Sequence, residues 1–160
     1  MRNNSLRNFV IALCVCACAA CSSNVVFEST ITPPNAVWSK EDIAVFTFTP
    51  RDTLTQYDII LSIRNTNDYA YSNLFVFSEI RFPNRQFTRD TIEFVLADAQ
   101  GEWTGKRWFS SHTNTFNFKQ GVRFPYEGEY TFLLEQAMRC TNKDCALSGI
   151  EKITVQIVER

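Results

Sequence analysis

Alternating apolar and polar residues recur along the chain after Trp38, and this pattern predicts a series of short β-strands. In each run every second residue is apolar, which places one side of the strand in a core and the other in water. Such runs occupy residues 44–49, 57–64, 91–96, 115–119, 130–135 and 153–157. The segment 74–82 is apolar on both faces at its start, which predicts a strand in the middle of a sheet.

Turn-forming residues separate these runs, as expected for strands joined by short loops. They include residues 50–52, 65–68, 83–84, 100–101 and 127–128. After residue 21 no stretch of ten or more residues has the 3.6-residue period of a helix. About seven to eight short strands with intervening turns predict an all-β fold, a single antiparallel β-sandwich. A closed barrel is the alternative.

The first 21 residues have a different pattern, that of a secretory signal. Arg2 and Arg7 flank a polar start, and an apolar run over residues 9–17 leads to two alanines and Cys21. A basic start, a short apolar stretch and small residues before a break are typical of a signal peptide. A Cys directly after two alanines resembles the bacterial lipobox, in which the Cys is acylated and becomes the new N-terminus. We therefore expect lipid on Cys21.

Two alternatives to this anchor stay open. Cys18 is a rival acylation site, because the apolar Val15 lies three places before it, as in a lipobox. Alternatively, an ordinary signal peptide cut near Ala20 would leave Cys21 as a free thiol. The expected organisation is a lipoprotein signal peptide over residues 1–20, a lipidated tether over 21–37 and a β-sandwich domain over 38–160. Within the tether, residues 25–27 are expected to form a short edge strand.

Length and charge narrow the class of protein. Cleavage before Cys21 would leave 140 residues, enough for one domain with a core. Removing Arg2 and Arg7 leaves 14 basic residues against 17 acidic ones, a net charge near −3. This balance gives no support for a nucleic-acid partner, which needs clustered Lys and Arg. Lipid is the only membrane contact that the sequence indicates.

Two of the six cysteines remain after the signal and the anchor are set aside. Cys140 and Cys145 are separated by four residues that include Asn and Asp, which suit a turn. Nearby cysteines usually pair in an oxidising compartment, so we expect a disulfide that closes this loop. A zinc site or a redox pair is the alternative, and zinc needs ligands that the chain lacks.

Few residues in the sequence are candidates for catalysis. His112 is the only histidine, and it lies in the polar segment 110–114, which predicts a solvated loop residue. Glu93, Asp98 and Glu102 are close in sequence, and a glycosidase needs two carboxyl groups flanking the bond, but such pairs also occur by chance in any acidic turn and no other feature indicates a cleft. The sequence therefore predicts no enzyme, no catalytic residues, no metal site and no cofactor.

A cluster of Trp, Gly and basic residues spans 101–109. Its candidate contact residues for a partner or ligand are Trp103, Lys106, Arg107 and Trp108. Exposed aromatic residues on a sandwich loop can stack on sugar rings or anchor a protein, where Trp and Arg dominate binding energy. Trp103 has a structural alternative, folding back to cap the open end of the sandwich. Arg64 and Arg139, each at a strand end, are expected to pair with nearby carboxylates.

Several stretches, in order along nearly all of the mature chain, resemble the gliding motility lipoprotein GldH family of the Bacteroidota. They are Trp38, Phe46-Thr47-Phe48, Ile63-Arg64-Asn65-Thr66, Tyr69-Ala70-Tyr71-Ser72-Asn73-Leu74, Leu96-Ala97-Asp98, Gly101-Glu102-Trp103-Thr104-Gly105-Lys106, Gly128-Glu129-Tyr130, Glu135-Gln136-Ala137-Met138-Arg139 and Leu147-Ser148-Gly149-Ile150.

The resemblance implies a lipid-anchored component of the cell envelope, associated with the gliding machinery or type IX secretion, whose partners are other envelope proteins. It supplies no catalytic residues. Because Ser22-Ser23-Asn24 lacks the acidic run that often marks surface export in this group, we expect the outer membrane, facing the periplasm. The alternative function is a carbohydrate-binding sandwich that uses Trp103 and Trp108.

Overall fold

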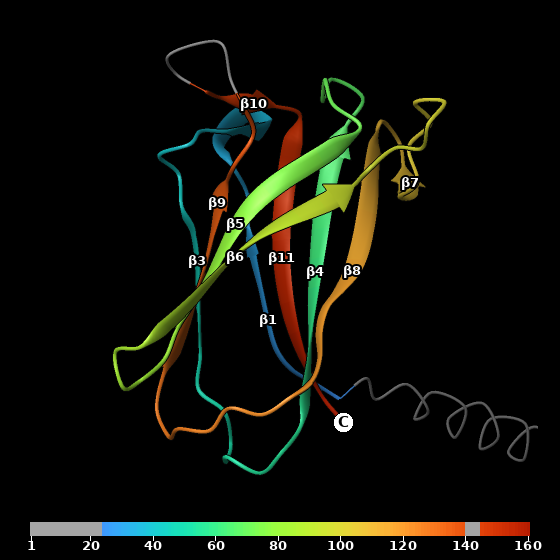
Figure 1. Cartoon of the computed structure of the whole chain (residues 1–160). Coiled ribbons are helices and arrows are strands. Elements are labelled where there is room, and N and C mark those ends of the chain that lie inside the picture. The colour runs from blue at the N-terminus through green and yellow to red at the C-terminus, as the bar shows by residue number, and fades with distance from the viewer. Residues whose placement is uncertain (1–23, 140–144) are drawn as a thin grey trace, which may run out of the picture.

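The computed structural model describes residues 24–139 and 145–160, and its regular structure is almost entirely β-strand (Figure 1). The strands are β1 Val25–Ile31, β2 Val37–Trp38, β3 Ala44–Phe48, β4 Tyr57–Thr66, β5 Asn73–Arg81, β6 Phe87–Val95, β7 Lys106–Trp108, β8 Ser111–Val122, β9 Tyr130–Gln136, β10 Leu147–Ser148 and β11 Ile150–Glu159. One short 3₁₀ helix, η2, spans Pro34–Ala36. These residues contain no α-helix, and the all-β prediction is confirmed.

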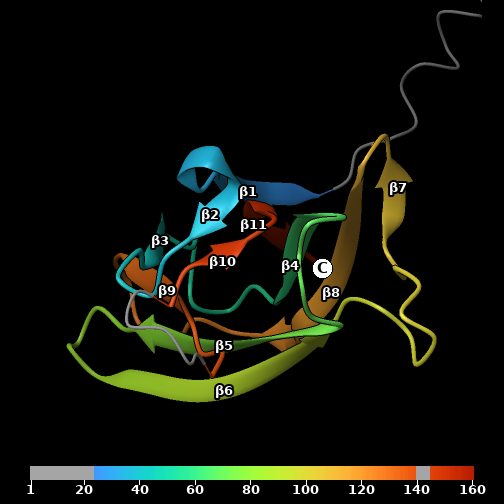
Figure 2. The same ribbon diagram turned by 90° about the horizontal axis from the view of Figure 1, so that it is seen from above.

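Two antiparallel sheets make up the body of the domain. The five-stranded sheet has the order β1-β11-β4-β8-β7, and the four-stranded sheet has the order β3-β9-β5-β6. Figure 2 shows the two sheets facing each other as layers, with the small pair β10-β2 between them at one end. The strand β5, predicted to be central, lies between β9 and β6.

The core forms where the inward sides of the two sheets meet. In β4 each second residue is buried, and β11 and β9 follow the same alternation. Ile63, Leu74 and Ile153 are completely shielded from solvent. Burial of a side chain of this size stabilises the fold by about 1.5–3 kcal/mol. The alternation in the sequence therefore corresponds directly to the two-layer packing.

The first strand corrects the predicted extent of the tether. The edge strand expected over residues 25–27 is present, but β1 continues to Ile31 and pairs with β11 along its length. Phe27 and Ile31 pack against the core, while Glu28 and Thr30 face outward. The second half of the expected tether also contributes η2 and β2, so the sheet structure begins at Val25 and not at Trp38.

The long strands give the domain two distinct ends. At the lower end in Figure 1, Tyr57 pairs with both Glu159 and Val122, and Asn24 O accepts a hydrogen bond of 2.8 Å from Glu159 N. At the upper end, Thr66 pairs with Ser111. Because β4 has ten residues, the two ends lie roughly 30 Å apart.

In the part of the chain that the structure describes, no helix has the length and apolar character needed to cross a bilayer.

Candidate functional site

The most exposed aromatic side chains lie on a tight hairpin at the upper end. Strands β7 and β8 pair Trp108 with Ser111, so only Phe109 and Ser110 form the turn. The side chains of Trp108 and Phe109 are 63% and 81% exposed, and their rings meet edge to face at 5.4 Å. We call Lys106, Arg107, Trp108 and Phe109 the hairpin tip.

Phe109 occupies an unusual backbone conformation for a bulky residue. Its φ is +53°, in the left-handed region that glycine and asparagine favour at turns. The carbonyl oxygen of Phe109 accepts a hydrogen bond of 3.1 Å from Arg107 Nε, which helps to hold the turn. Strain of this kind costs of order 1–3 kcal/mol, and it is concentrated at functional sites in proteins. The strain here presents an aromatic ring to solvent.

Trp103 does not belong to this exposed surface. Its side chain is half-buried and packs against the core, with its ring 6.4 Å from that of Tyr69 and stacked at 5.9 Å on His112. Ala97 forms a β-bridge with Trp103, which returns the loop to the sandwich. Trp103 therefore folds back onto the sandwich, as its structural alternative predicted. Of the four residues predicted from the sequence, only Lys106, Arg107 and Trp108 lie together on the exposed hairpin.

His112 is not the solvated loop residue that the sequence predicts. It lies in β8 and is 8% exposed, because β8 begins at Ser111 and turns its even-numbered side chains inward. His112 Nδ1, Asn65 Oδ1 and Asn114 Nδ2 are all buried without a protein hydrogen-bond partner. Buried polar atoms of this kind are usually satisfied by ordered water. Because Trp103 stacks on His112, this histidine belongs to the packing at the upper end.

The three acidic residues singled out from the sequence have structural roles or lie apart. Asp98 Oδ1 accepts hydrogen bonds from the backbone N–H groups of Gln100 at 3.0 Å and Glu102 at 2.9 Å, which closes the loop after β6. Glu93 accepts a hydrogen bond from Asn73 Nδ2 at 2.6 Å. Among residues 24–139 and 145–160, no three His, Cys, Asp or Glu side chains gather in a way that could hold a metal ion.

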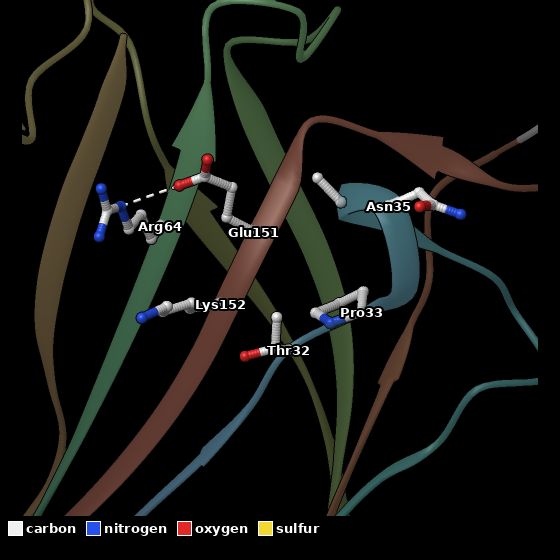
Figure 3. Close-up of a pocket in the computed structure, with 7 residues that line it drawn as sticks. Thr32, Pro33, Asn35, Arg64, Glu151 and Lys152 are labelled. Carbon is white, nitrogen blue, oxygen red and sulfur yellow. Dashed lines mark ion pairs between the residues drawn. The ribbon is translucent and has the colours of Figure 1, made fainter. Parts of the chain in front are cut away.

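A cavity of about 370 Å³ lies near the upper end of the domain, on the outer side of the five-stranded sheet (Figure 3). Arg64, Glu151 and Lys152 line one side, and Thr32 with the η2 turn lines the other. Arg64 Nε lies 2.9 Å from Glu151 Oε2, so the predicted ion pair of Arg64 is confirmed. The sequence predicted a carboxylate partner for Arg64 without naming Glu151, and it did not predict the cavity, because Thr32 and Lys152 are far apart in the chain.

The predicted covalent features fall mainly outside the described residues. Cys18, Cys21 and Cys140 are not among them, whereas Cys145 is. The lipid anchor and the disulfide between Cys140 and Cys145 therefore stay predictions. The ion pair expected for Arg139 also stays a prediction, since the neighbouring residues 140–144 are outside the described part.

Comparison with known proteins gives one consistent result. The family model for the GldH lipoprotein matches residues 25–157. A gliding motility lipoprotein GldH homolog of Christiangramia forsetii is 34% identical over 117 residues, covering 73% of this chain and 72% of that protein. The gliding motility lipoprotein GldH of Flavobacterium johnsoniae is 26% identical over 135 residues, covering 84% and 83% of the two chains. The match begins at the first residue of β1.

Proposed function

Because this chain belongs to the GldH family of lipoproteins linked to gliding motility, we propose that it is a non-catalytic docking component of the cell envelope. Its hairpin tip binds another envelope protein of the motility or type IX secretion machinery. Lipid on Cys21 holds the domain at the outer membrane, facing the periplasm. The lack of an acidic run directly after Cys21 supports this location.

The observation that carries the proposal is the composition and exposure of the hairpin tip. Trp and Arg are the residue types that most often dominate binding energy at protein interfaces. Here Trp108 and Phe109 project from a two-residue turn, with Arg107 and Lys106 beside them. The left-handed Phe109 costs stability and leaves its ring in water, a cost that a partner surface would offset by burying that ring.

The position of the tip also supports docking away from the anchor. Residue 24, three residues after the expected lipid-bearing Cys21, lies at the lower end beside Glu159. The hairpin tip lies at the opposite end, since Trp108 pairs with Ser111 and Ser111 with Thr66. The length of β4 separates the two by roughly 30 Å, so a lipid at one end leaves the tip free to meet a protein.

A non-catalytic role agrees with the surroundings of the chain's one histidine. A serine-type triad needs a histidine within hydrogen-bond reach of both a nucleophile and a carboxylate. His112 instead stacks on Trp103, and its Nδ1 has no protein partner.

The alternative function, carbohydrate binding by Trp103 and Trp108 together, is weakened because the two tryptophans do not share a surface. Trp103 packs inward, and Trp108 alone remains available to stack on a sugar ring.

The proposal is tested by co-purification of the full-length protein from crosslinked envelopes. We expect wild type to recover motility or secretion components, and Trp108→Ala and Phe109→Ala to lose most of that recovery. Leu54→Ala is the matched control, because Leu54 is 78% exposed but lies in the loop between β3 and β4, away from the tip. Undiminished recovery with both tip variants, or equal loss with Leu54→Ala, would contradict docking through the tip.

A further inference from the structure

The cavity beside η2 combines free positive charge with a shaped wall, and we infer that it binds the anionic group of an acidic glycan. The cavity residues Arg64 and Lys152 lie outside the hairpin tip, so this inference can hold or fail separately from the docking proposal, although the ligand would extend toward Lys106 and Trp108 of the tip. The ligand would be a sugar chain bearing carboxylate or phosphate groups, which both present oxygens to Arg and Lys in the same way.

The charges of the cavity are only partly neutralised. Glu151 pairs with Arg64 at Nε, and this contact lacks hydrogen-bond geometry. No hydrogen bond within residues 24–139 and 145–160 occupies the two Nη groups of Arg64, so they can act as a bidentate donor. Lys152 is exposed and forms no ion pair within residues 24–139 and 145–160. Figure 3 shows the Arg64 and Lys152 side chains reaching to the same side, with the Thr32 hydroxyl directed toward Lys152.

The opposite wall is held in a strained conformation. Asn35 and Ala36 both adopt left-handed backbone angles, with φ of +53° and +55°, although neither is glycine. Ala36 O accepts a hydrogen bond of 2.8 Å from Gly149 N, which fixes the turn against the connection between β10 and β11. Adjacent strained residues that the surrounding structure holds in place are a recurrent feature of ligand-binding sites.

Strand register extends the positive charge beyond the cavity. Lys152 pairs with Arg64, Arg64 with Thr113, and Thr113 with Lys106. These four residues form one row across β11, β4, β8 and β7, and three strand spacings make the row about 14 Å long. Trp108 lies two residues after Lys106 and therefore on the same face. A chain-like ligand can follow this row from the cavity to an exposed aromatic ring.

The rest of this face favours a glycan over a protein. Its next row carries hydroxyl groups, which pair as Thr30 with Thr154 at 2.7 Å and Ser62 with Thr115 at 3.0 Å. A protein interface usually has an apolar, aromatic core. Hydroxyl groups beside cations and a single tryptophan instead match a polar, anionic polymer with rings that can stack. An acidic peptide is the competing ligand, and a binding titration distinguishes it from an acidic glycan.

The test is a binding titration of the full-length protein in detergent with four probes of similar size. We expect binding of polygalacturonate or of a phosphorylated dextran, and the stronger of the two identifies the anionic group. Neutral dextran and polyglutamate should bind at least tenfold more weakly. Lack of binding to both acidic glycans, or equal binding of neutral dextran, would overturn the inference. Equal or tighter binding of polyglutamate would assign the site to an acidic peptide and overturn the glycan.

Two substitutions localise the binding to the cavity. Arg64→Gln and Lys152→Gln should each weaken binding of the acidic glycan at least fivefold. The matched control is Arg51→Gln, because Arg51 is also paired with a glutamate, Glu159, but at the lower end. Equal weakening by the control would mean unspecific attraction and overturn the site. Lys152 is exposed, so Lys152→Gln decides the question even if Arg64→Gln unfolds the domain.

Discussion

Replacement of Gly149 by alanine is a sharp test of how the upper end is assembled. Gly149 has a φ of +88°, and a Cβ at this position would lie 2.5 Å from Tyr69 N and 2.8 Å from Tyr69 Cα. These are backbone atoms, so no side-chain rotation relieves the contact. Thr66 N donates to Gly149 O, and Gly149 N donates to Ala36 O, both at 2.8 Å. A shift of Gly149 therefore disturbs the end of β4 and the η2 turn together.

The expected cost has two parts. The left-handed backbone costs an alanine about 1 kcal/mol relative to glycine. The forced backbone movement adds roughly 1–3 kcal/mol, as for overpacking of a core. Gly149→Ala should therefore lower the free energy of unfolding by about 2–4 kcal/mol. In a domain of this size that lowers the Tm by roughly 6–12 °C.

Gly101→Ala is the control that separates the two parts. Gly101 has a similar φ of +84°, but nothing lies within 4 Å of the added Cβ. It should cost only about 1 kcal/mol, the backbone part alone. Both variants are compared with wild type by urea denaturation followed by circular dichroism. An equal effect of the two substitutions would refute the close approach of Gly149 to Tyr69.

Three further predictions concern the core, the two tryptophans and acid stability. Ile63→Ala removes a fully buried side chain and should cost about 2–5 kcal/mol in urea denaturation, whereas Ile60→Ala, on the outer face, should cost far less. Trp103→Ala should lower the Tm by several degrees, while Trp108→Ala should leave it within about 2 °C, since surface substitutions rarely exceed ~0.5 kcal/mol. The pKa of Asp58 lies below its ordinary value because the Gly121 N–H donates to its carboxylate, with Arg160 adding to the effect. This stabilisation is present above the unfolded pKa and is lost as pH falls through the lower folded pKa, so Asp58→Asn should reduce the loss of stability measured below about pH 4.

Strands buried on one side were the elements that the sequence could predict. In β4 and β11, burial against the opposite sheet demands an apolar residue at every second position, and the sequence has that pattern. Edge strands lack this demand. The first five residues of β6 are all exposed, and its beginning was accordingly missed. In β1, serine and glutamate interrupt the apolar series, so only part of the strand was predicted.

The candidate site, too, could be predicted only in part from the sequence. The sequence placed Lys106, Arg107 and Trp108 on an exposed segment, and the structure agrees. It offered an inward-packed Trp103 as an alternative but could not decide between the two placements, because the packing of Trp103 on Tyr69 and His112 depends on residues 34 and 9 positions away. His112 was misjudged because serine, threonine and asparagine are common in loops, whereas here they alternate along β8. The cavity is lined by the segment that follows β1, by η2, and by residues of β4 and β11, and only the folded arrangement brings these residues together.

The most direct test of docking through the hairpin tip is photo-crosslinking in the cells that produce the protein. A photoreactive amino acid is placed at position 109 in one strain and at position 54 in another, two positions of similar exposure in different loops. We predict a discrete crosslinked product with another envelope protein from position 109 and none from position 54. Crosslinks of equal yield from both positions, or products from position 54 alone, would contradict the account.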